Sequence, residues 1–149
     1  MNTEIFLPMF YLMLWTVGVF LFSTTVRLKE IYLHKVLNKK PISPEEHRHP
    51  PFTEGSRVLK NTQRNLVNLF EFPIFFYAIC IIIFITNNSN ELYVTLAYWF
   101  LYLRIAHSLY HIFFNHLVFN GGFPLRSIIW IPSTLVLVWL WMLVICSFS

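Results

Sequence analysis

Residues 64–73 read RNLVNLFEFP, a stretch in which polar side chains open a long apolar run. Arg64, Asn68 and Glu71 are spaced i, i+4 and i+7, so on a helix they share one stripe. No charged residue follows in residues 74–85. The pattern predicts a membrane helix whose polar stripe faces a helical bundle, where a glutamate needs a partner or a function.

The composition around this stretch is that of an integral membrane protein. Hydrophobic residues make up 56% of the 149 residues, and charged residues only 12%, about half of their usual share in a soluble domain. The mean hydropathy is +0.58. The first apolar run, residues 5–26, contains 22 residues without a charge, which is enough for one bilayer span.

The positive charge is concentrated in one connection. Nine of the eleven Lys and Arg lie between Arg27 and Arg64. The net charge of +4 alone would suggest nucleic acid as a partner, but its distribution argues otherwise. A juxtamembrane loop of this kind fits anionic lipid headgroups better, so no nucleic-acid partner is expected. His47 and His49 stand beside two prolines without a Cys or Asp nearby, so no metal site is expected either.

Four apolar helices account for residues 1–149 as a single transmembrane domain. The expected helices span about 5–38, 56–86, 91–119 and 125–147. Pro73 lies inside the second helix and predicts a kink there. By the positive-inside rule the basic loop, at about 39–55, is cytoplasmic, and both termini then lie on the non-cytoplasmic side.

The third predicted helix carries a regular polar face within an apolar sequence. Its members stand at offsets 0, 3, 4, 7 and 11 along the helix: Arg104, His107, Ser108, His111 and Asn115. Because consecutive helices run in opposite directions, this face is expected to meet the stripe of the second helix in the cytoplasmic half of the membrane. Arg126, in the first turn of the fourth helix, is expected at the mouth of the same region.

Two interpretations of these polar residues are open. Glu71 and Arg104 can form a buried ion pair, with Asn68 and the histidines linking helices through hydrogen bonds. Such pairs cost desolvation and need extra partners, so they seldom serve stability alone. In the alternative interpretation, which we favour, the residues line a pocket open to the cytoplasm. Its arginines would bind carboxylates and Glu71 an ammonium group.

Three motifs resemble the MAPEG family, the membrane-associated proteins in eicosanoid and glutathione metabolism. The second-helix pattern R-x-x-x-N-x-x-E-x-P, residues 64–73, resembles the most characteristic motif of the family. The third-helix pattern R-x-x-H-S-x-x-H-x-x-x-N, residues 104–115, is similar to that of the less characterised bacterial branch. The sequence PLRS, residues 124–127, resembles the start of the fourth helix in the prostaglandin-synthase branch. The resemblance covers nearly the whole chain and is closest to the bacterial branch.

The resemblance implies an all-α, integral membrane four-helix bundle assembled as a homotrimer. Glutathione would bind between adjacent subunits on the cytoplasmic side. Its α-amino group would meet Glu71, and its carboxylates would meet arginines. Carried over by position, the glutathione-binding residues are Arg64, Asn68, Glu71, Arg104 and Ser127.

The resemblance also implies roles in catalysis. Arg126 is the candidate for stabilising the glutathione thiolate, because a thiol with a pKa of about 8.5 needs a nearby cation to ionise at neutral pH. His107 and His111 are candidate general bases, since histidine titrates near neutrality. His111 stands where the eicosanoid-synthesising members carry a tyrosine, which favours the bacterial branch.

The expected activity is that of a glutathione-dependent transferase or peroxidase acting on lipophilic electrophiles. The expected location is a bacterial inner membrane, or the endoplasmic reticulum if the chain is eukaryotic. One alternative is a non-catalytic MAPEG-like scaffold that binds lipid or glutathione. Another is a small proton-coupled transporter that uses Glu71 and the histidines as a relay. The expected partners are two further copies of the chain, membrane lipids and a lipophilic small-molecule substrate.

Overall fold

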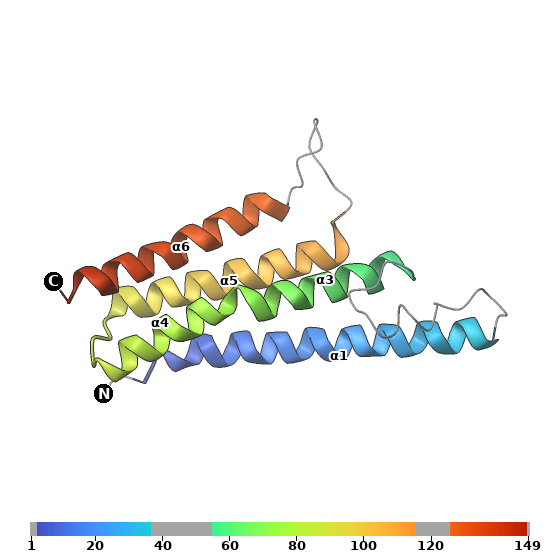
Figure 1. Cartoon of the computed structure of the whole chain (residues 1–149), viewed down its shortest axis with the longest axis horizontal. Coiled ribbons are helices and arrows are strands. Elements are labelled where there is room, and N and C mark those ends of the chain that lie inside the picture. The colour runs from blue at the N-terminus through green and yellow to red at the C-terminus, as the bar shows by residue number, and fades with distance from the viewer. Residues whose placement is uncertain (1–2, 37–54, 116–125, 149) are drawn as a thin grey trace.

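The described part of the chain is helical throughout. The computed structural model describes residues 3–36, 55–115 and 126–148. Its helices are α1 (Phe6–Val36), α3 (Arg57–Glu71), α4 (Pro73–Ile85), α5 (Glu91–Phe113) and α6 (Arg126–Cys146). Helices α3 and α4 are two segments of one element, so the described ranges contain four helical rods (Figure 1). The all-α, four-helix membrane bundle predicted from the sequence is confirmed.

The predicted cytoplasmic loop at about 39–55 lies almost wholly outside the described residues. The same holds for the predicted helix ends at 37–38, 116–119 and 125.

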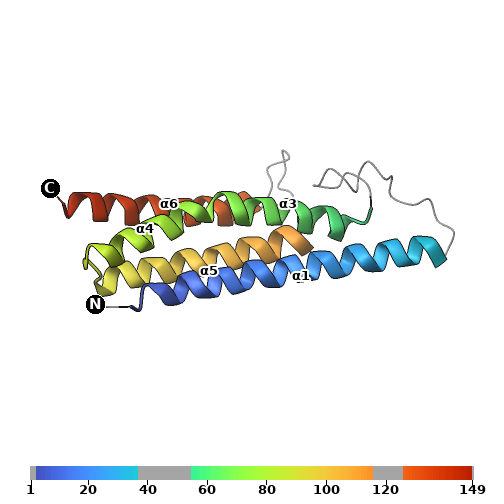
Figure 2. The same cartoon turned by 60° about the horizontal axis from the view of Figure 1, so that its bottom comes forward.

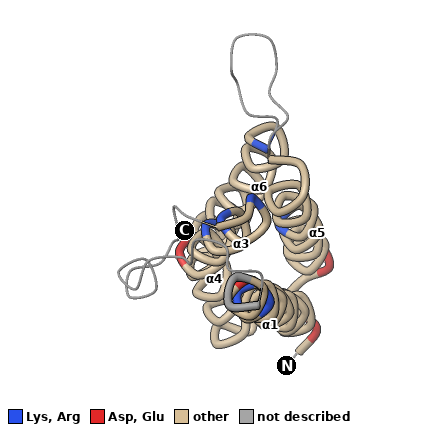
Figure 3. The backbone as a smooth tube through the Cα atoms, turned by 90° about the vertical axis from the view of Figure 1, so that its right-hand side faces the viewer, with Lys and Arg blue, Asp and Glu red and all other residues tan. Residues whose placement is uncertain are grey.

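The rods run up and down alternately, so both described ends of the chain lie at the same end of the bundle (Figures 1 and 2). Helix α5 contacts α1, α3 and α6, so it has each of the other three rods as a neighbour. At the opposite end α1 finishes and α3 and α6 begin. Figure 3 looks along the bundle from that end, with Lys and Arg positions of α3, α5 and α6 lying close together in projection.

Three of the rods are long and apolar enough to cross a membrane: Phe6–Leu33, Arg57–Ile85 and Arg126–Cys146. Helix α5, which carries the predicted polar face, is not among them. The outer surface of the bundle is apolar, with large side chains such as Leu21, Ile85 and Leu135 more than half exposed. Exposing so much apolar surface to water would be unfavourable, whereas its contact with lipid chains is favourable. The protein is therefore a membrane protein.

The second rod bends where the sequence predicts a kink. Pro73 begins α4 and has no amide N–H, so it cannot continue the hydrogen-bond ladder of α3. The bend is visible between α3 and α4 in Figures 1 and 2. It changes the neighbours of the rod, because α3 contacts α1 and α5 whereas α4 contacts α1 and α6. The bend therefore brings the segment before Pro73 against the polar face of α5.

Side chains fix where two of the helices begin. The Ser56 Oγ accepts a hydrogen bond from Leu59 N at 3.1 Å, and the Asn90 Oδ1 accepts one from Tyr93 N at 2.9 Å. Both residues have extended backbone and so act as N-caps of α3 and α5. The N–H of Ser56 also donates to the Glu30 carboxylate at 3.1 Å, which ties the start of α3 to α1.

The interior of the bundle divides into an apolar half and a polar half. In the half near the chain ends, the rings of Phe76 and Phe100 stack at 4.5 Å and are fully buried beside Ile83 and Leu140. In the other half, the buried side chains include many polar ones: Asn61, Thr62, Asn65, Arg104, His107, Ser108 and His111. Polar groups buried inside a membrane bundle are costly and point to a functional site.

Candidate functional site

The candidate site lies between α3, α5 and α6 in the polar half of the bundle. Helix α5 turns its polar face inward, with Arg104 1% exposed, His107 3% and His111 2%. Ser108 is fully buried, and Asn115 is partly buried in the turn that follows α5, because the helix ends at Phe113 rather than continuing through residue 115 as predicted. The sequence predicted these positions as one face, and the structure places them on one face.

Arg104 is a buried cation, and the described residues pair only some of its hydrogen-bond donors. Its Nη2 donates to the backbone oxygen of Asn68 at 2.8 Å, and the guanidinium lies 5.3 Å from the centroid of the Phe72 ring. Its Nε and Nη1 are buried and have no hydrogen-bond partner among the described residues. The buried ion pair with Glu71 is therefore not formed within the described chain, because Arg104 meets the backbone of α3 and Glu71 is exposed at its end.

The predicted stripe of α3 does not face the interior as expected. Arg64 and Glu71 are exposed, and Asn68 is partly buried. The packing of Leu59, Leu66 and Leu69 sets the rotation of α3 and turns Arg64 and Glu71 outward. In the single chain, these two side chains lie on the surface of the bundle beside the site rather than within it.

Two other asparagines of α3 face α5 instead, and the sequence interpretation did not single them out. The Asn61 Nδ2 donates to the backbone oxygen of Ile112 at 3.1 Å. The Asn65 Nδ2 donates to the Ser108 Oγ at 2.6 Å, while its Oδ1 has no partner in the described structure. Asn61, Asn65 and Asn68 repeat the spacing i, i+4 and i+7, which is the signal that could have identified this face.

Arg126 joins the start of α6 to the polar face of α5. Its Nη1 donates to the Asn115 Oδ1 at 2.8 Å and lies 3.3 Å from the His111 Nε2. Its backbone oxygen lies 3.2 Å from the His107 Nδ1. The structure thus brings the three residues predicted to be catalytic into contact. Ser127, the next residue along α6, is partly buried.

These contacts fix the tautomers of the two histidines. A guanidinium only donates, so the His111 Nε2 must accept and the ring proton is on Nδ1. A carbonyl only accepts, so the His107 Nδ1 carries its proton and Nε2 is a free acceptor. The His107 Nε2 and the His111 Nδ1 are buried without a partner among the described residues. The two ring centroids are 5.8 Å apart.

The site therefore contains a set of buried polar atoms that the described chain does not satisfy: Arg104 Nε and Nη1, Asn65 Oδ1, His107 Nε2 and His111 Nδ1. Each such group costs about 1–3 kcal/mol, and a charged one more, unless a partner is supplied. The unsatisfied Nε and Nη1 of Arg104 lie on different sides of its guanidinium, and each can donate a charge-assisted hydrogen bond to an anion such as a carboxylate. The described residues include no group of three possible metal ligands.

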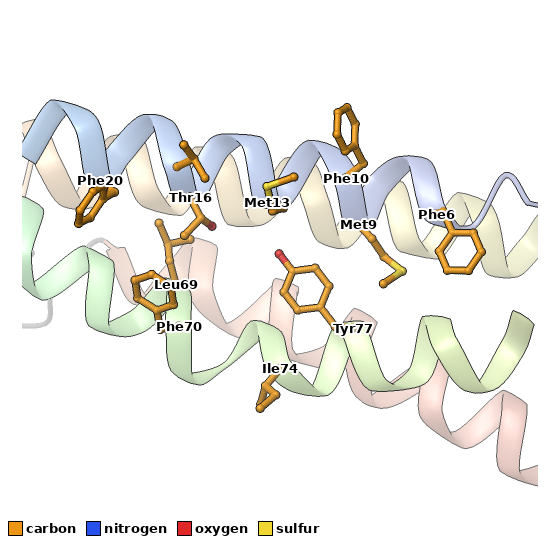
Figure 4. A pocket seen from close by; sticks show the side chains of 11 residues that line it. Phe6, Met9, Phe10, Met13, Thr16, Phe20, Leu69, Phe70, Ile74 and Tyr77 are labelled. Atoms are coloured by element: carbon orange, nitrogen blue, oxygen red, sulfur yellow. The ribbon is translucent and has the colours of Figure 1, made fainter.

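An apolar groove lies outside this cluster, between α1 and the bent rod formed by α3 and α4 (Figure 4). Its volume is about 750 Å³, and its walls include Met9 and Met13 from α1 and Phe70, Ile74 and Tyr77 from the bent rod. Phe70 directly precedes Glu71, so one end of the groove adjoins the exposed stripe. A groove of this composition suits a lipophilic molecule.

Comparison with known proteins agrees with the motifs. The chain matches the model of the MAPEG family over residues 5–146, which is nearly its whole length. No curated protein and no solved structure matches it. The resemblance inferred from the motifs of three helices is confirmed, and the chain belongs to the MAPEG family.

Proposed function

We propose that the protein is a membrane-embedded, glutathione-dependent transferase or peroxidase that acts on lipophilic electrophiles. The observation that supports this most strongly is Arg104, a buried cation with two donor atoms that no described residue satisfies. A buried cation of this kind is costly unless an anion pairs with it. Glutathione carries two carboxylates, and the MAPEG family acts in glutathione metabolism, so glutathione is the anion we assign.

Residues of three helices would hold glutathione. Arg104 would bind one of its carboxylates through one of its free donors, Nε or Nη1, with Asn68 and Ser127 beside it. Arg64 and Glu71 are exposed on the outer side of α3 and would bind the remaining carboxylate and the α-amino group. Because these two side chains lie at the surface of the single chain, a neighbouring copy would be needed to enclose the ligand. This supports assembly as a homotrimer with the site between subunits.

The chemistry of the site follows from Arg126 and the two histidines. Bound glutathione supplies a thiolate that can attack an electrophile or reduce a hydroperoxide. A cation close to a thiol favours its ionised form, and Arg126 supplies that cation. Its Nε and Nη2 make no hydrogen bond to another described residue, so they remain able to donate to the sulfur. The His107 Nε2 is a buried acceptor without a partner among the described residues, so it can accept a hydrogen bond from the thiol.

The proposed substrate reaches this site from the bilayer. The apolar groove between α1 and the bent rod is suited to hold its lipophilic part next to the stripe that ends at Glu71. We place the polar half of the bundle on the cytoplasmic side, because α1 ends and α3 begins at that end and the sequence from Arg27 to Arg64 carries nine of the eleven Lys and Arg. A bacterial inner membrane is the location we propose, in line with the resemblance to the bacterial branch.

The test is titration of the purified protein with glutathione, followed by turnover assays with an aryl halide and with a lipid hydroperoxide. Glutathione binding with turnover of either substrate is the expected result. Binding without turnover would favour the scaffold alternative. Proton-coupled flux in liposomes that is lost in Glu71→Gln would favour the transporter. The absence of both binding and turnover would refute the proposal. Arg57→Met removes an exposed arginine at the start of α3. It serves as the control for replacing an arginine of the site, and it should bind glutathione as the wild type does.

A further inference from the structure

We propose that Asn61 and Asn115 are positioning residues that aim the Arg126 guanidinium at the sulfur of glutathione. This inference rests on the proposed function. It begins from a continuous chain of hydrogen bonds across three helices. The Asn61 Nδ2 donates to Ile112 O at 3.1 Å, the Asn115 Nδ2 donates to Asn61 Oδ1 at 3.2 Å, and the Arg126 Nη1 donates to Asn115 Oδ1 at 2.8 Å.

The direction of every bond in this chain is set by its two ends. The carbonyl of Ile112 can only accept, so Asn61 must present its amide nitrogen there and its oxygen to Asn115. Asn115 must then donate to Asn61, which leaves its own oxygen for Arg126. The guanidinium can only donate, so it completes the chain without a mismatch. Turning either amide over would set two like groups against each other at both of its contacts.

This chain of hydrogen bonds fixes one edge of the Arg126 guanidinium and leaves the other edge available. Both hydrogens of Nη1 are used, one by Asn115 and one by the His111 Nε2 at 3.3 Å. The planar fork of arginine is rigid, so fixing Nη1 also fixes the directions of Nη2 and Nε. Asn61 is 5% exposed and never touches Arg126, so it acts on the guanidinium only through Asn115.

A purely structural role for these asparagines is the competing interpretation, since amides often link membrane helices. The two interpretations differ in one observable. A structural link affects stability alone, whereas a positioning residue affects the ionisation of the thiol that Arg126 stabilises. An opposite charge at close range lowers a pKa by about 1–3 units, so misdirecting the cation forfeits a measurable part of that effect.

The experiment measures the thiolate absorbance of glutathione bound to the full-length protein as a function of pH. In Asn115→Leu we expect the apparent pKa of the bound thiol to rise by about one unit, which is about a tenfold loss of thiolate at pH values well below both pKa values. Asn61→Leu should shift the pKa in the same direction by less. Glutathione affinity measured at low pH, where the thiol is protonated, should change less than about threefold in both variants.

Asn88→Leu is the matched control. Asn88 lies between α4 and α5 and donates to the Oγ of Ser147, which follows α6, at the opposite end of the bundle. Its loss therefore removes an amide hydrogen bond between two distant segments without affecting Arg126. The control should leave the thiol pKa unchanged even if it lowers thermal stability. Asn115→Ala replaces Asn115→Leu if the leucine variant does not fold.

Two results would overturn the inference. An unchanged thiol pKa in both asparagine variants, with normal glutathione binding by the wild type, would leave only the structural role. A wild-type protein that binds no glutathione would refute the proposed function, and this inference with it. The first result refutes the inference alone, so the two failures are distinguishable.

Discussion

Replacing Arg104 by methionine should abolish strong glutathione binding while leaving the ligand-free protein close to its original stability. Arg104 is 1% exposed and makes one hydrogen bond, from Nη2 to Asn68 O at 2.8 Å. Its Nε and Nη1 have no partner among the described residues. Methionine is unbranched and apolar, so it can fill much of the same space without carrying the charge.

The expected magnitude follows from the donor atoms. A hydrogen bond to a charged group contributes about 1.5–3 kcal/mol, so one bond from Nε or Nη1 to a carboxylate contributes about that much. Its loss should raise the Kd for glutathione about 10- to 100-fold. In the ligand-free protein, the loss of one bond between helices, worth about 0.6 kcal/mol in a membrane, is offset by removal of a buried charge. The free energy of unfolding should therefore change by less than about 1 kcal/mol.

Titration calorimetry on the wild type, Arg104→Met and the control Arg57→Met measures the affinity. Thermal unfolding with and without glutathione measures the stability, and glutathione should raise the melting temperature of the wild type and the control only. Equal affinities in all three proteins would refute the assignment of Arg104 to a ligand carboxylate. A ligand-free Arg104→Met that is several kcal/mol less stable would instead identify Arg104 as a structural cation.

Three further changes have defined outcomes. Ser108→Ala leaves the buried Asn65 Nδ2 without its acceptor, so unfolding in detergent should show a loss of about 1–3 kcal/mol, more than Ser133→Ala, whose hydroxyl bonds only within its own helix. Gly18→Ala should raise the unfolding free energy by about 0.5–1 kcal/mol, because an added Cβ meets nothing within 4 Å. A lower stability there would reveal a second copy packed against α1. Glu71→Gln should weaken glutathione binding in calorimetry about tenfold without changing the ligand-free melting temperature, since its carboxylate is exposed. An unchanged affinity would exclude Glu71 from the site.

The rods of the bundle could be predicted because their signals are local. An uncharged run such as residues 5–26 is long enough to span a bilayer whatever packs against it. Pro73 predicts the bend between α3 and α4 because the missing N–H is a property of the residue itself. Helix α5 was also predictable, although its polar face leaves it outside the three most apolar rods.

The inward face of α5 was predictable for a related reason. Its apolar background leaves only one stripe of polar residues, so the offsets from Arg104 to Asn115 allow a single interpretation. The contact of Arg126 with His107 and His111 follows once α5 and α6 are antiparallel neighbours.

The rotation of α3 could not be predicted in the same way. This helix carries polar side chains on several sides, and two stripes share the spacing i, i+4 and i+7. One runs from Arg64 to Glu71, and the other runs from Asn61 to Asn68. Only the packing of its leucines in three dimensions decides that Asn61 and Asn65 face α5. The chain of hydrogen bonds through Asn115 depends on that rotation, so it could not be predicted from the sequence.

The most direct test is an experimental structure of the protein in a lipid nanodisc with glutathione bound. The proposed function requires a glutathione carboxylate within hydrogen-bond distance of Arg104 Nε or Nη1, with the sulfur beside Arg126. It also requires Arg64 and Glu71 to contact the ligand at the border with a second copy of the chain. Glutathione bound elsewhere, or Arg104 paired with a carboxylate of another protein chain in its place, would contradict the assignment.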